Sequence, residues 1–129
     1  MPSIIKMSNA TIIAIHCMDY MSKNKKMASA KEMAKALNIS YNHLSKVLQR
    51  LAGLNMVETS RGPAGGYSLT EKGRKSKIRE IIYSIEGEKK YSNCLMEIKC
   101  DKKKCAFRSF LDAIMEGYNK ILEKKLNEI

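Results

Sequence analysis

Three cysteines lie close together in the second half of the chain, and they are its clearest candidates for chemistry. Cys94, Cys100 and Cys105 are spaced C-x5-C-x4-C, and lysines flank them. Positive charge nearby favours the thiolate, the form that binds metals and is oxidised. A zinc site needs four ligands, usually with cysteine pairs closer together, and no C-x-x-C redox pair is present. Iron-sulfur clusters accept looser spacing, so the triad favours a cluster over zinc.

The fourth cysteine has a different setting. Cys17 follows an apolar run with Ile12, Ile13 and Ile15, which predicts a largely buried first helix from about Ser8 to Tyr20. We expect Cys17 to be a small buried hydrophobe. The N-terminus lacks the charged-then-apolar pattern of a secretory signal, so we expect a cytoplasmic chain, where reduced thiols prevail.

A helix and a hairpin in the first half form the element around which the chain is organised. Ser40 can cap this helix, and Gly53 is expected to end it in a left-handed conformation. Four apolar residues at three- and four-residue steps predict its buried stripe: Leu44, Val47, Leu48 and Leu51. Two strands, residues 56–60 and 67–69, are predicted to enclose a basic, glycine-rich turn, residues 61–66.

A second short helix completes a DNA-binding motif. Ser29 can cap a helix over residues 30–37, and Asn38-Ile39 makes a tight connection to the next helix. Two helices joined in this way and followed by a hairpin form a winged helix-turn-helix, whose second helix enters the major groove of DNA. Asn42 and Gln49 match adenine edges, and Lys46 matches guanine or phosphate. The residues predicted to contact double-stranded DNA are Ser40, Tyr41, Asn42, His43, Lys46, Gln49, Arg61, Gly62 and Lys72.

These residues resemble a known family. The segment Asn42-His43-Leu44 with Lys46, followed by Arg61-Gly62-Pro63-x-Gly65-Gly66-Tyr67-x-Leu69, is similar to the IscR/NsrR/CymR family of dimeric bacterial repressors, often called the Rrf-two family. The resemblance covers nearly the whole chain, because the family also carries a three-cysteine loop near Cys94, Cys100 and Cys105. It implies the winged-helix fold, a homodimer and a pseudo-palindromic operator. It also implies an iron-sulfur cluster, of the 2Fe-2S or 4Fe-4S type, whose loss or reaction with oxygen or nitric oxide, or iron scarcity, alters DNA affinity.

The fourth cluster ligand departs from the family's pattern. Some members have a histidine shortly after the third cysteine, where this chain has Arg108. Others have an acidic residue near the N-terminus of the partner subunit, where this chain has Asn9. The substitutes that the sequence offers are Glu97, Asp101, Asp19 and His16. The site could also stay open to a small thiol or water, and cluster-free control by thiol oxidation or by docking to a partner enzyme is the alternative.

Length and charge agree with a small nucleic-acid-binding protein. The 129 residues allow one modest core, and the net charge is +11. Residues 1–75 contain 12 Lys and Arg against 4 Asp and Glu, whereas residues 76–129 contain 12 against 9. The positive field therefore lies on the half predicted to bind DNA, where it would displace counterions from phosphates. No apolar run is long enough to suggest a membrane span.

The last third of the chain predicts two further helices. One is expected to start at Thr70 and run to Gly87, with a basic beginning that includes Lys72 and an apolar end. The other covers residues 106–129, with apolar residues at helical spacing from Phe107 to Leu126. Such a stripe exceeds what a small core can bury, and two-fold pairing with a second copy would cover it.

The sequence thus predicts a mainly α fold with a small β-hairpin wing. Its parts are a winged helix-turn-helix over residues 1–87, a cysteine-containing sensor loop over 88–105 and a dimerisation helix over 106–129. The predicted function is a homodimeric transcriptional regulator, most simply a repressor, controlled by a cluster or by the redox state of the loop. An enzyme is disfavoured, because the sequence lacks G-x-x-x-x-G-K, H-E-x-x-H and a plausible Ser, His and Asp set.

Overall fold

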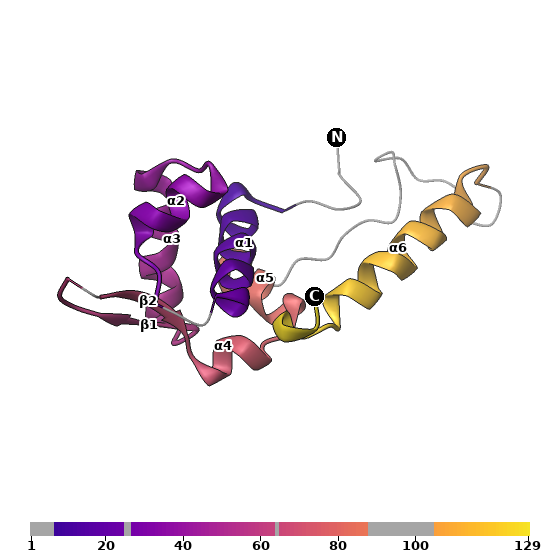
Figure 1. Ribbon diagram of the computed structural model, residues 1–129. Helices are drawn as coiled ribbons and strands as arrows, with labels where there is room; N and C mark the ends of the chain where they lie inside the picture. Colours follow the sequence, from indigo (N-terminus) through magenta and orange to yellow (C-terminus); the bar gives the residue numbers. More distant parts are fainter. Residues whose placement is uncertain (1–6, 25–26, 64, 88–104) are drawn as a thin grey trace.

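The computed structural model describes residues 7–24, 27–63, 65–87 and 105–129 (Figure 1). Cys94 and Cys100 lie outside the described residues, as do the candidate ligands Glu97 and Asp101. The described part is mostly helical, with one two-stranded antiparallel hairpin, as the sequence predicts.

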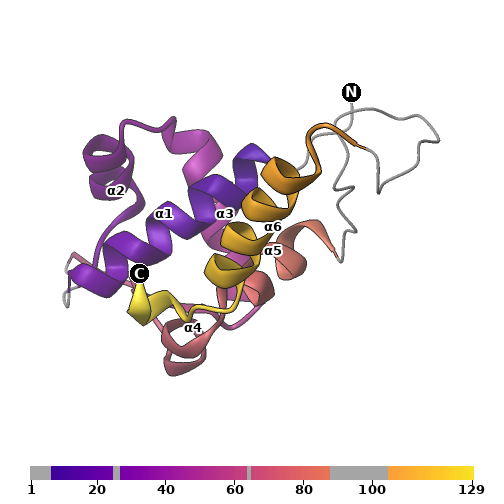
Figure 2. The same cartoon turned by 90° about the vertical axis from the view of Figure 1, so that its right-hand side faces the viewer.

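The first helix, α1 (Asn9–Lys23), lies in the centre of the fold (Figure 2). Ser8 caps it, since its hydroxyl accepts from the backbone N–H of Thr11 at 3.2 Å. Its buried residues include Ile13, Cys17 and Met21, and the helix contacts α2, α3, α5 and β2. A helix this apolar is stable only inside a core, and here the other elements form around it.

Two helices of the helix-turn-helix follow, α2 (Ala30–Leu37) and α3 (Tyr41–Gly53). Ser29 caps α2 by accepting from Glu32 N–H at 3.1 Å, and Asn38 makes the tight turn in the left-handed region with φ 54°. The prediction that Gly53 would be left-handed is wrong. Gly53 is the last residue of α3, and Asn55 takes the positive φ, 60°, because asparagine also tolerates this conformation.

The hairpin consists of β1 (Val57–Ser60) and β2 (Gly66–Leu69), with Val57 opposite Leu69 and Ser60 opposite Gly66. The segment before α2 joins this sheet. Tyr67 N–H donates to the Ala28 carbonyl at 2.8 Å, and Ala28 N–H donates to the Tyr67 carbonyl at 3.0 Å. A Cβ on Gly66 would lie 2.6 Å from the Ala28 carbonyl oxygen, so only glycine allows this close approach.

The single helix predicted from Thr70 to Gly87 is wrong, because the chain forms two helices there. These are α4 (Glu71–Lys75) and α5 (Ile78–Glu86). The break at Ser76 and Lys77 has a tertiary cause. Leu126 N–H donates to the Ser76 carbonyl and Ile78 N–H donates to the Lys124 carbonyl, both at 2.9 Å. The backbone between α4 and α5 therefore pairs with the end of the chain instead of continuing a helix.

The same pairing shortens the predicted C-terminal helix. Helix α6 (Arg108–Leu122) ends before the pairing, and a single 3-10 turn, η2 (Leu126–Glu128), follows it. Leu126, predicted on the helix stripe, is instead 1% exposed in the main core. Helix α6 projects away from the N-terminal helices, to which α5 and the end of the chain connect it (Figure 1). No helix within the described residues has the length and apolarity to cross a membrane.

Candidate nucleic-acid interface

One face of α3 presents three polar side chains to solvent. Asn42, Lys46 and Gln49 stand at i, i+4 and i+7, and all three are exposed. The four predicted stripe residues of α3 are buried on the opposite side: Leu44, Val47, Leu48 and Leu51. Burial of that stripe fixes the roll of the helix, so the three polar side chains form one outward face. The two amides can each donate to and accept from a base edge, and the ammonium can donate to one.

The start of α3 adds groups suited to a phosphate. Ser40 is the capping residue, but its side chain makes no capping hydrogen bond, and its backbone carbonyl accepts from Leu44 N–H at 2.9 Å. The prediction that the Ser40 side chain caps α3 is therefore wrong. Ser40 is exposed, and its hydroxyl makes no hydrogen bond to the first turn of the helix. Tyr41 is 47% exposed beside it. The positive end of the helix dipole also points here, which favours an anion.

His43 occupies the flank of α3, away from the outward face. It lines a hollow between α1, α2 and α3, together with His16 and Asn9. The hollow thus brings together two residues considered as ligand positions from the sequence, His16 and Asn9, but Cys105 is not among its lining residues. Asp19, another of those candidates, accepts from Lys23 at 3.0 Å along the same helix.

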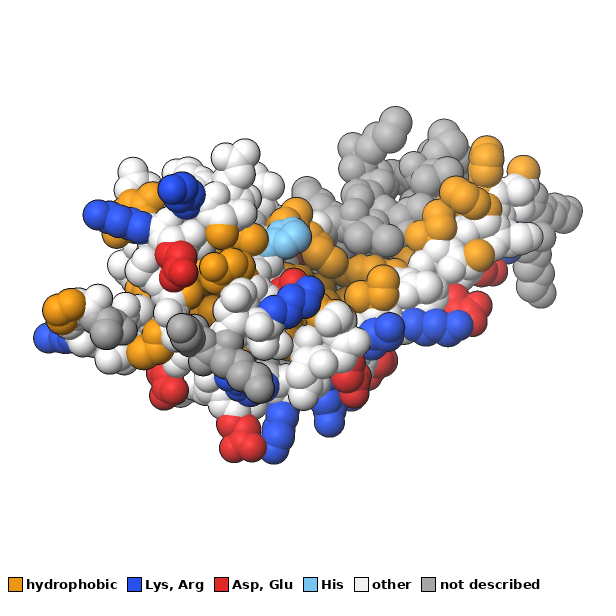
Figure 3. Space-filling model, in the orientation of Figure 1, with side chains coloured by type: hydrophobic (Ala, Val, Ile, Leu, Met, Phe, Trp, Pro, Cys, Tyr) orange, Lys and Arg blue, Asp and Glu red, His pale blue; other side chains and the backbone are white. Residues whose placement is uncertain are grey.

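The wing extends beyond the helices, and its tip is exposed. Arg61, Gly62 and Pro63 are all open to solvent, and Gly62 turns the chain with φ 106°. Lys and Arg side chains appear over the α2–α3 edge and at the end of the hairpin (Figure 3). A basic wing tip beside a polar helix face matches the two contact regions of a winged helix-turn-helix.

Lys72 is placed differently from the other predicted contacts. It is exposed on α4, and its ammonium donates to the Leu54 carbonyl at 3.1 Å. This bond covers a carbonyl at the C-terminal end of α3, where a cation also interacts favourably with the helix dipole. Lys72 therefore has a structural contact of its own at the end of α3 opposite Ser40.

The two cysteines that the structure describes, Cys17 and Cys105, differ in burial. Burial raises the pKa of the Cys17 thiol to about 12, so this thiol is inert and packs as a hydrophobe, as the sequence predicts. Cys105 is partly exposed just before α6. Arg108 pairs with Asp112 at 3.2 Å. The described residues contain no group of three metal-binding side chains, and two of the three predicted cysteine ligands lie outside them.

Two polar links between elements were not predicted from the sequence. Arg50, in the last turn of α3, donates to the Ile85 carbonyl at 2.6 Å. Glu123, just after α6, accepts from Lys77 and Arg79. Both links join residues far apart in the chain, so no local spacing could have revealed them.

A family model described as an iron-dependent transcriptional regulator, Rrf2, matches residues 7–129. The chain belongs to the Rrf2 family. The resemblance noted in the sequence is thereby confirmed, and membership places the chain among transcriptional regulators, a class without enzymatic activity.

Individual Rrf2 relatives are similar over most of this chain. The HTH-type transcriptional repressor NsrR of Streptomyces coelicolor is 29% identical over 96 residues, which are 74% of this chain and 65% of that protein. The regulator NsrR of Bacillus subtilis is 26% identical over 125 residues, 93% of this chain and 86% of that protein.

Solved structures show the fold of the Rrf2 chain. CymR, the global cysteine regulator of B. subtilis, matches with a TM-score of 0.69 and 23% identity, covering 95% of this chain and 93% of its own. T. potens IscR matches with a TM-score of 0.65 and 22% identity, covering 95% and 83%. The predicted fold class, a winged helix-turn-helix with a further C-terminal helix, is confirmed by these neighbours.

Proposed function

We propose that the chain is a homodimeric, sequence-specific DNA-binding repressor whose operator affinity is set by the three-cysteine loop. In this proposal residues 1–87 bind DNA, residues 88–105 sense the signal and residues 106–129 make the dimer. A regulator that binds bacterial chromosomal DNA acts in the cytoplasm, so we propose this location for the chain.

The outward face of α3 carries the DNA-binding part of the proposal. Asn42, Lys46 and Gln49 are exposed, aligned and held by a buried stripe, so the face is rigid and available. Arg61 at the wing tip is suited to an adjacent minor groove, where narrow A·T-rich DNA concentrates negative potential. Ser40, Tyr41, His43, Gly62 and Lys72 complete the proposed contact set and supply phosphate contacts around the face.

Selection from random-sequence duplex DNA with the wild-type chain tests this part. We expect a pseudo-palindromic operator with half-sites about one helical turn apart. The matched variant pair is Gln49→Ala on the outward face and Glu32→Gln on the exposed face of α2. The first should alter the selected bases and the second should not, whereas selection of no sequence at all would contradict sequence-specific binding.

Helix α6 carries the dimer part. Phe107, Phe110, Ile114 and Ile121 fall on one side of the helix, and the first two are 56% and 59% exposed. Next to α6, an apolar groove is lined by residues of α1, α5 and the chain end, including Ile12, Ile78 and Ile129. Figure 3 shows hydrophobic side chains, in orange, along α6 and in the hollow beside it. An apolar surface this continuous favours pairing with a second copy.

Sedimentation equilibrium of Phe110→Glu tests the dimer. A buried charge at a two-fold contact should shift the chain to a monomer and lower operator affinity at least tenfold, since each monomer then binds a single half-site. Ser109→Glu places the same charge on an exposed position of the same helix turn and is the control. A wild-type chain that sediments as a monomer would remove the dimer from the proposal.

The sensing part rests on the donor set. Three thiols suit an iron-sulfur cluster, and Cys94, Cys100 and Cys105 would hold it. Cys105 fits this role in the structure because it is partly exposed and lies where the chain enters α6. When bound, the cluster would supply a centre that is sensitive to oxidants and to iron supply. The description of the family as iron-dependent supports this part.

One observation favours a cluster-free alternative. Arg108 is engaged with Asp112 and cannot replace a histidine ligand, since a guanidinium has no free lone pair to offer a metal. Control would then come from oxidation of the loop thiols or from docking to a partner enzyme. Iron and acid-labile sulfide content, together with an absorption spectrum, distinguish cluster control from cluster-free control. All are measured on anaerobically purified protein. Comparable iron and sulfide support the cluster, and their absence supports the alternative.

A further inference from the structure

Helix α5 is joined to the DNA-binding helix α3 at its C-terminal end. The guanidinium of Arg50, in α3, donates a hydrogen bond to the Ile85 carbonyl of α5 at 2.6 Å, and this bond is partly buried. Ile85 lies in the last turn of α5, where carbonyls lack partners within the helix. The positive charge of Arg50 also meets the negative end of the α5 dipole. The link is therefore directional and uses a carbonyl that needs a donor.

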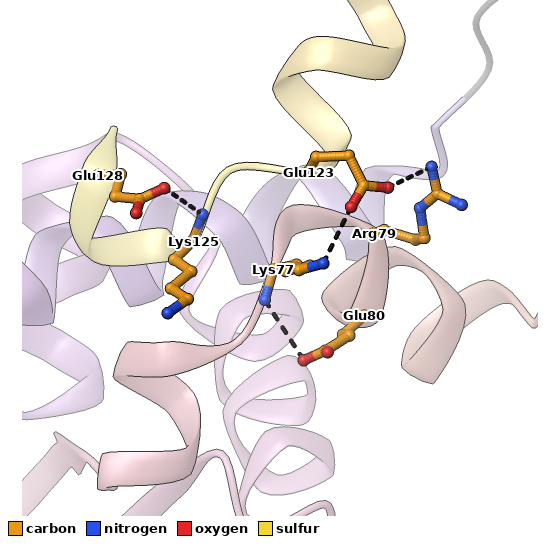
Figure 4. A network of polar contacts seen from close by, with 6 residues as sticks. All are labelled: Lys77, Arg79, Glu80, Glu123, Lys125 and Glu128. Atoms are coloured by element: carbon orange, nitrogen blue, oxygen red, sulfur yellow. Dashed lines mark hydrogen bonds and ion pairs between the residues drawn. The ribbon is translucent and has the colours of Figure 1, made fainter.

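The N-terminal end of α5 is joined to the end of α6. The Glu123 carboxylate follows α6 directly and lies between Lys77 and Arg79, with contacts of 3.0 and 2.6 Å (Figure 4). Lys77 is the residue before α5, and Arg79 is in its first turn. Two backbone hydrogen bonds flank this carboxylate, from Ile78 to Lys124 and from Leu126 to Ser76. The end of α6 is thus fixed to the start of α5 by both charge and backbone pairing.

These two links define a continuous path from α6 to α3. Helix α5 has nine residues and is about 13 Å long, so it acts as a short rigid rod between them. If α6 lies on the two-fold axis of a dimer, the angle between α6 and α5 decides how far apart the two α3 helices stand. A change of a few degrees at Glu123 would move the outward face of α3 relative to its symmetry mate.

We propose that Arg50 and Glu123 are positioning residues that set the spacing of the two DNA-reading helices through α5. The inference rests on the proposed function, because it requires a dimer that reads two half-sites. Arg50 lies outside the outward face formed by Asn42, Lys46 and Gln49, and its guanidinium is already bonded to the Ile85 carbonyl. Its effect on DNA binding is therefore expected through α5.

The test varies the spacing between half-sites. The DNA probes are the operator selected with the wild-type chain, versions with one or two base pairs added to or removed from its centre, and a single half-site. Each base pair changes both the distance and the rotation between half-sites, so the wild type should lose about tenfold in affinity per base pair. The variants are Glu123→Gln and Arg50→Met, which remove the links while keeping most of each side chain.

Controls separate positioning from general effects. Glu116→Gln and Lys120→Gln remove a contact of 3.4 Å that lies entirely within α6. Glu123, Glu116 and Lys120 belong to exposed ion pairs, which contribute little to stability, and the Arg50 link is one hydrogen bond. All four variants should therefore fold, which circular dichroism and a urea transition check. Arg50→Lys keeps a donor and should recover part of the wild-type behaviour, which a general loss of stability would not predict.

We expect both link variants to reduce the spacing discrimination to about threefold or less, with half-site affinity within about twofold of wild type. The two control variants should keep the wild-type discrimination. Link variants that retain full spacing discrimination would overturn the inference and leave the proposed function intact. A wild-type chain that binds half-sites independently of spacing, or binds no DNA, would instead overturn the dimeric function on which the inference rests.

Discussion

At the scale of single residues, the strongest prediction concerns the two amides on the outward face of α3. Asn42→Ala and Gln49→Ala each remove a side chain able to make two hydrogen bonds to one base. Each should cost about 1–3 kcal/mol on the selected operator and almost nothing on an operator already mutated at the contacted base pair. Fluorescence anisotropy against single-base operator variants measures this. An equal loss on every operator would contradict base reading.

Lys72 should behave differently, because an ammonium reads no sequence on phosphate. Lys72→Gln is expected to weaken binding to all duplexes alike and to reduce the slope of log affinity against log salt by about one. The bond from Lys72 to the Leu54 carbonyl adds a second expected effect, a loss of about 0.5–1 kcal/mol of folding free energy. An unchanged salt slope with lowered stability would assign Lys72 to the fold alone.

The two described cysteines should differ sharply in reactivity. Cys17 is fully buried and burial raises its pKa to about 12, whereas Cys105 is partly exposed. Iodoacetamide at pH 8 should therefore label Cys105 in the folded, metal-free chain and Cys17 only after unfolding in urea. Peptide mass spectrometry locates the label. Labelling of Cys17 in the folded state would contradict its place in the core.

Residue roles could be predicted where a local pattern fixes them. The four-residue stripe of α3 and the cap at Ser29 follow from spacing and side-chain chemistry, and the structure confirms both. Gly53 illustrates the limit, since more than one residue near a helix end tolerates positive φ, and Asn55 takes it. The role of Arg50 could not be predicted, because its acceptor lies 35 residues away.

At the scale of elements, the end of the chain determines how residues 70–87 fold. Leu126 is 1% exposed and packs in the main core, although only a short 3-10 turn holds it. Leu126→Ala should cost about 2–4 kcal/mol of unfolding free energy, through lost apolar burial and a cavity. Ile129→Ala, 46% exposed, is the matched control and should cost about 0.5 kcal/mol or less. Urea titration measures both free energies of unfolding. Equal losses for the two variants would contradict the burial of Leu126 in the core.

The helix boundaries in this region could not be predicted from sequence for the same reason. Residues 71–86 have the composition of one amphipathic helix, and local propensity offers no reason to break it at Ser76. The break satisfies backbone groups of Lys124 and Leu126, which are distant in sequence. Pairing between distant backbones overrides propensity here, as tertiary context often does. The order and type of the earlier elements depend on local signals, and they were predicted.

At the scale of the whole molecule, the separation of charge complements the arrangement of the elements. The half with α1, α2, α3 and the wing carries most of the excess positive charge, and α6 extends away from it. DNA would therefore be attracted to one end of the molecule while the apolar face of α6 stays available to a second copy. Within the described residues, Glu123 supplies an electrostatic contact between these two ends, through Lys77 and Arg79.

That connection should depend on pH in a defined direction. The hydrogen bond from Lys77, helped by the charge of Arg79, holds the pKa of the Glu123 carboxyl below its ordinary value of 4.5. A carboxyl with a lowered pKa in the folded state stabilises the fold above that ordinary value, and the contribution is lost as the pH falls through its folded pKa. The difference in urea midpoint between wild type and Glu123→Gln should thus be constant from pH 8 to about 5.5 and vanish at more acid pH.

A double variant identifies the partners responsible. In a Lys77→Met, Arg79→Met background, Glu123→Gln should leave the urea midpoint unchanged at every pH, because both cations that contact the carboxylate have been removed. The wild-type difference should also shrink in 0.5 M salt, since Glu123 is half exposed and screening acts on exposed charges. A difference that persists at the most acid pH at which the chain still folds, or in the double variant, would mean that Glu123 holds α6 to α5 through packing and not through its charge.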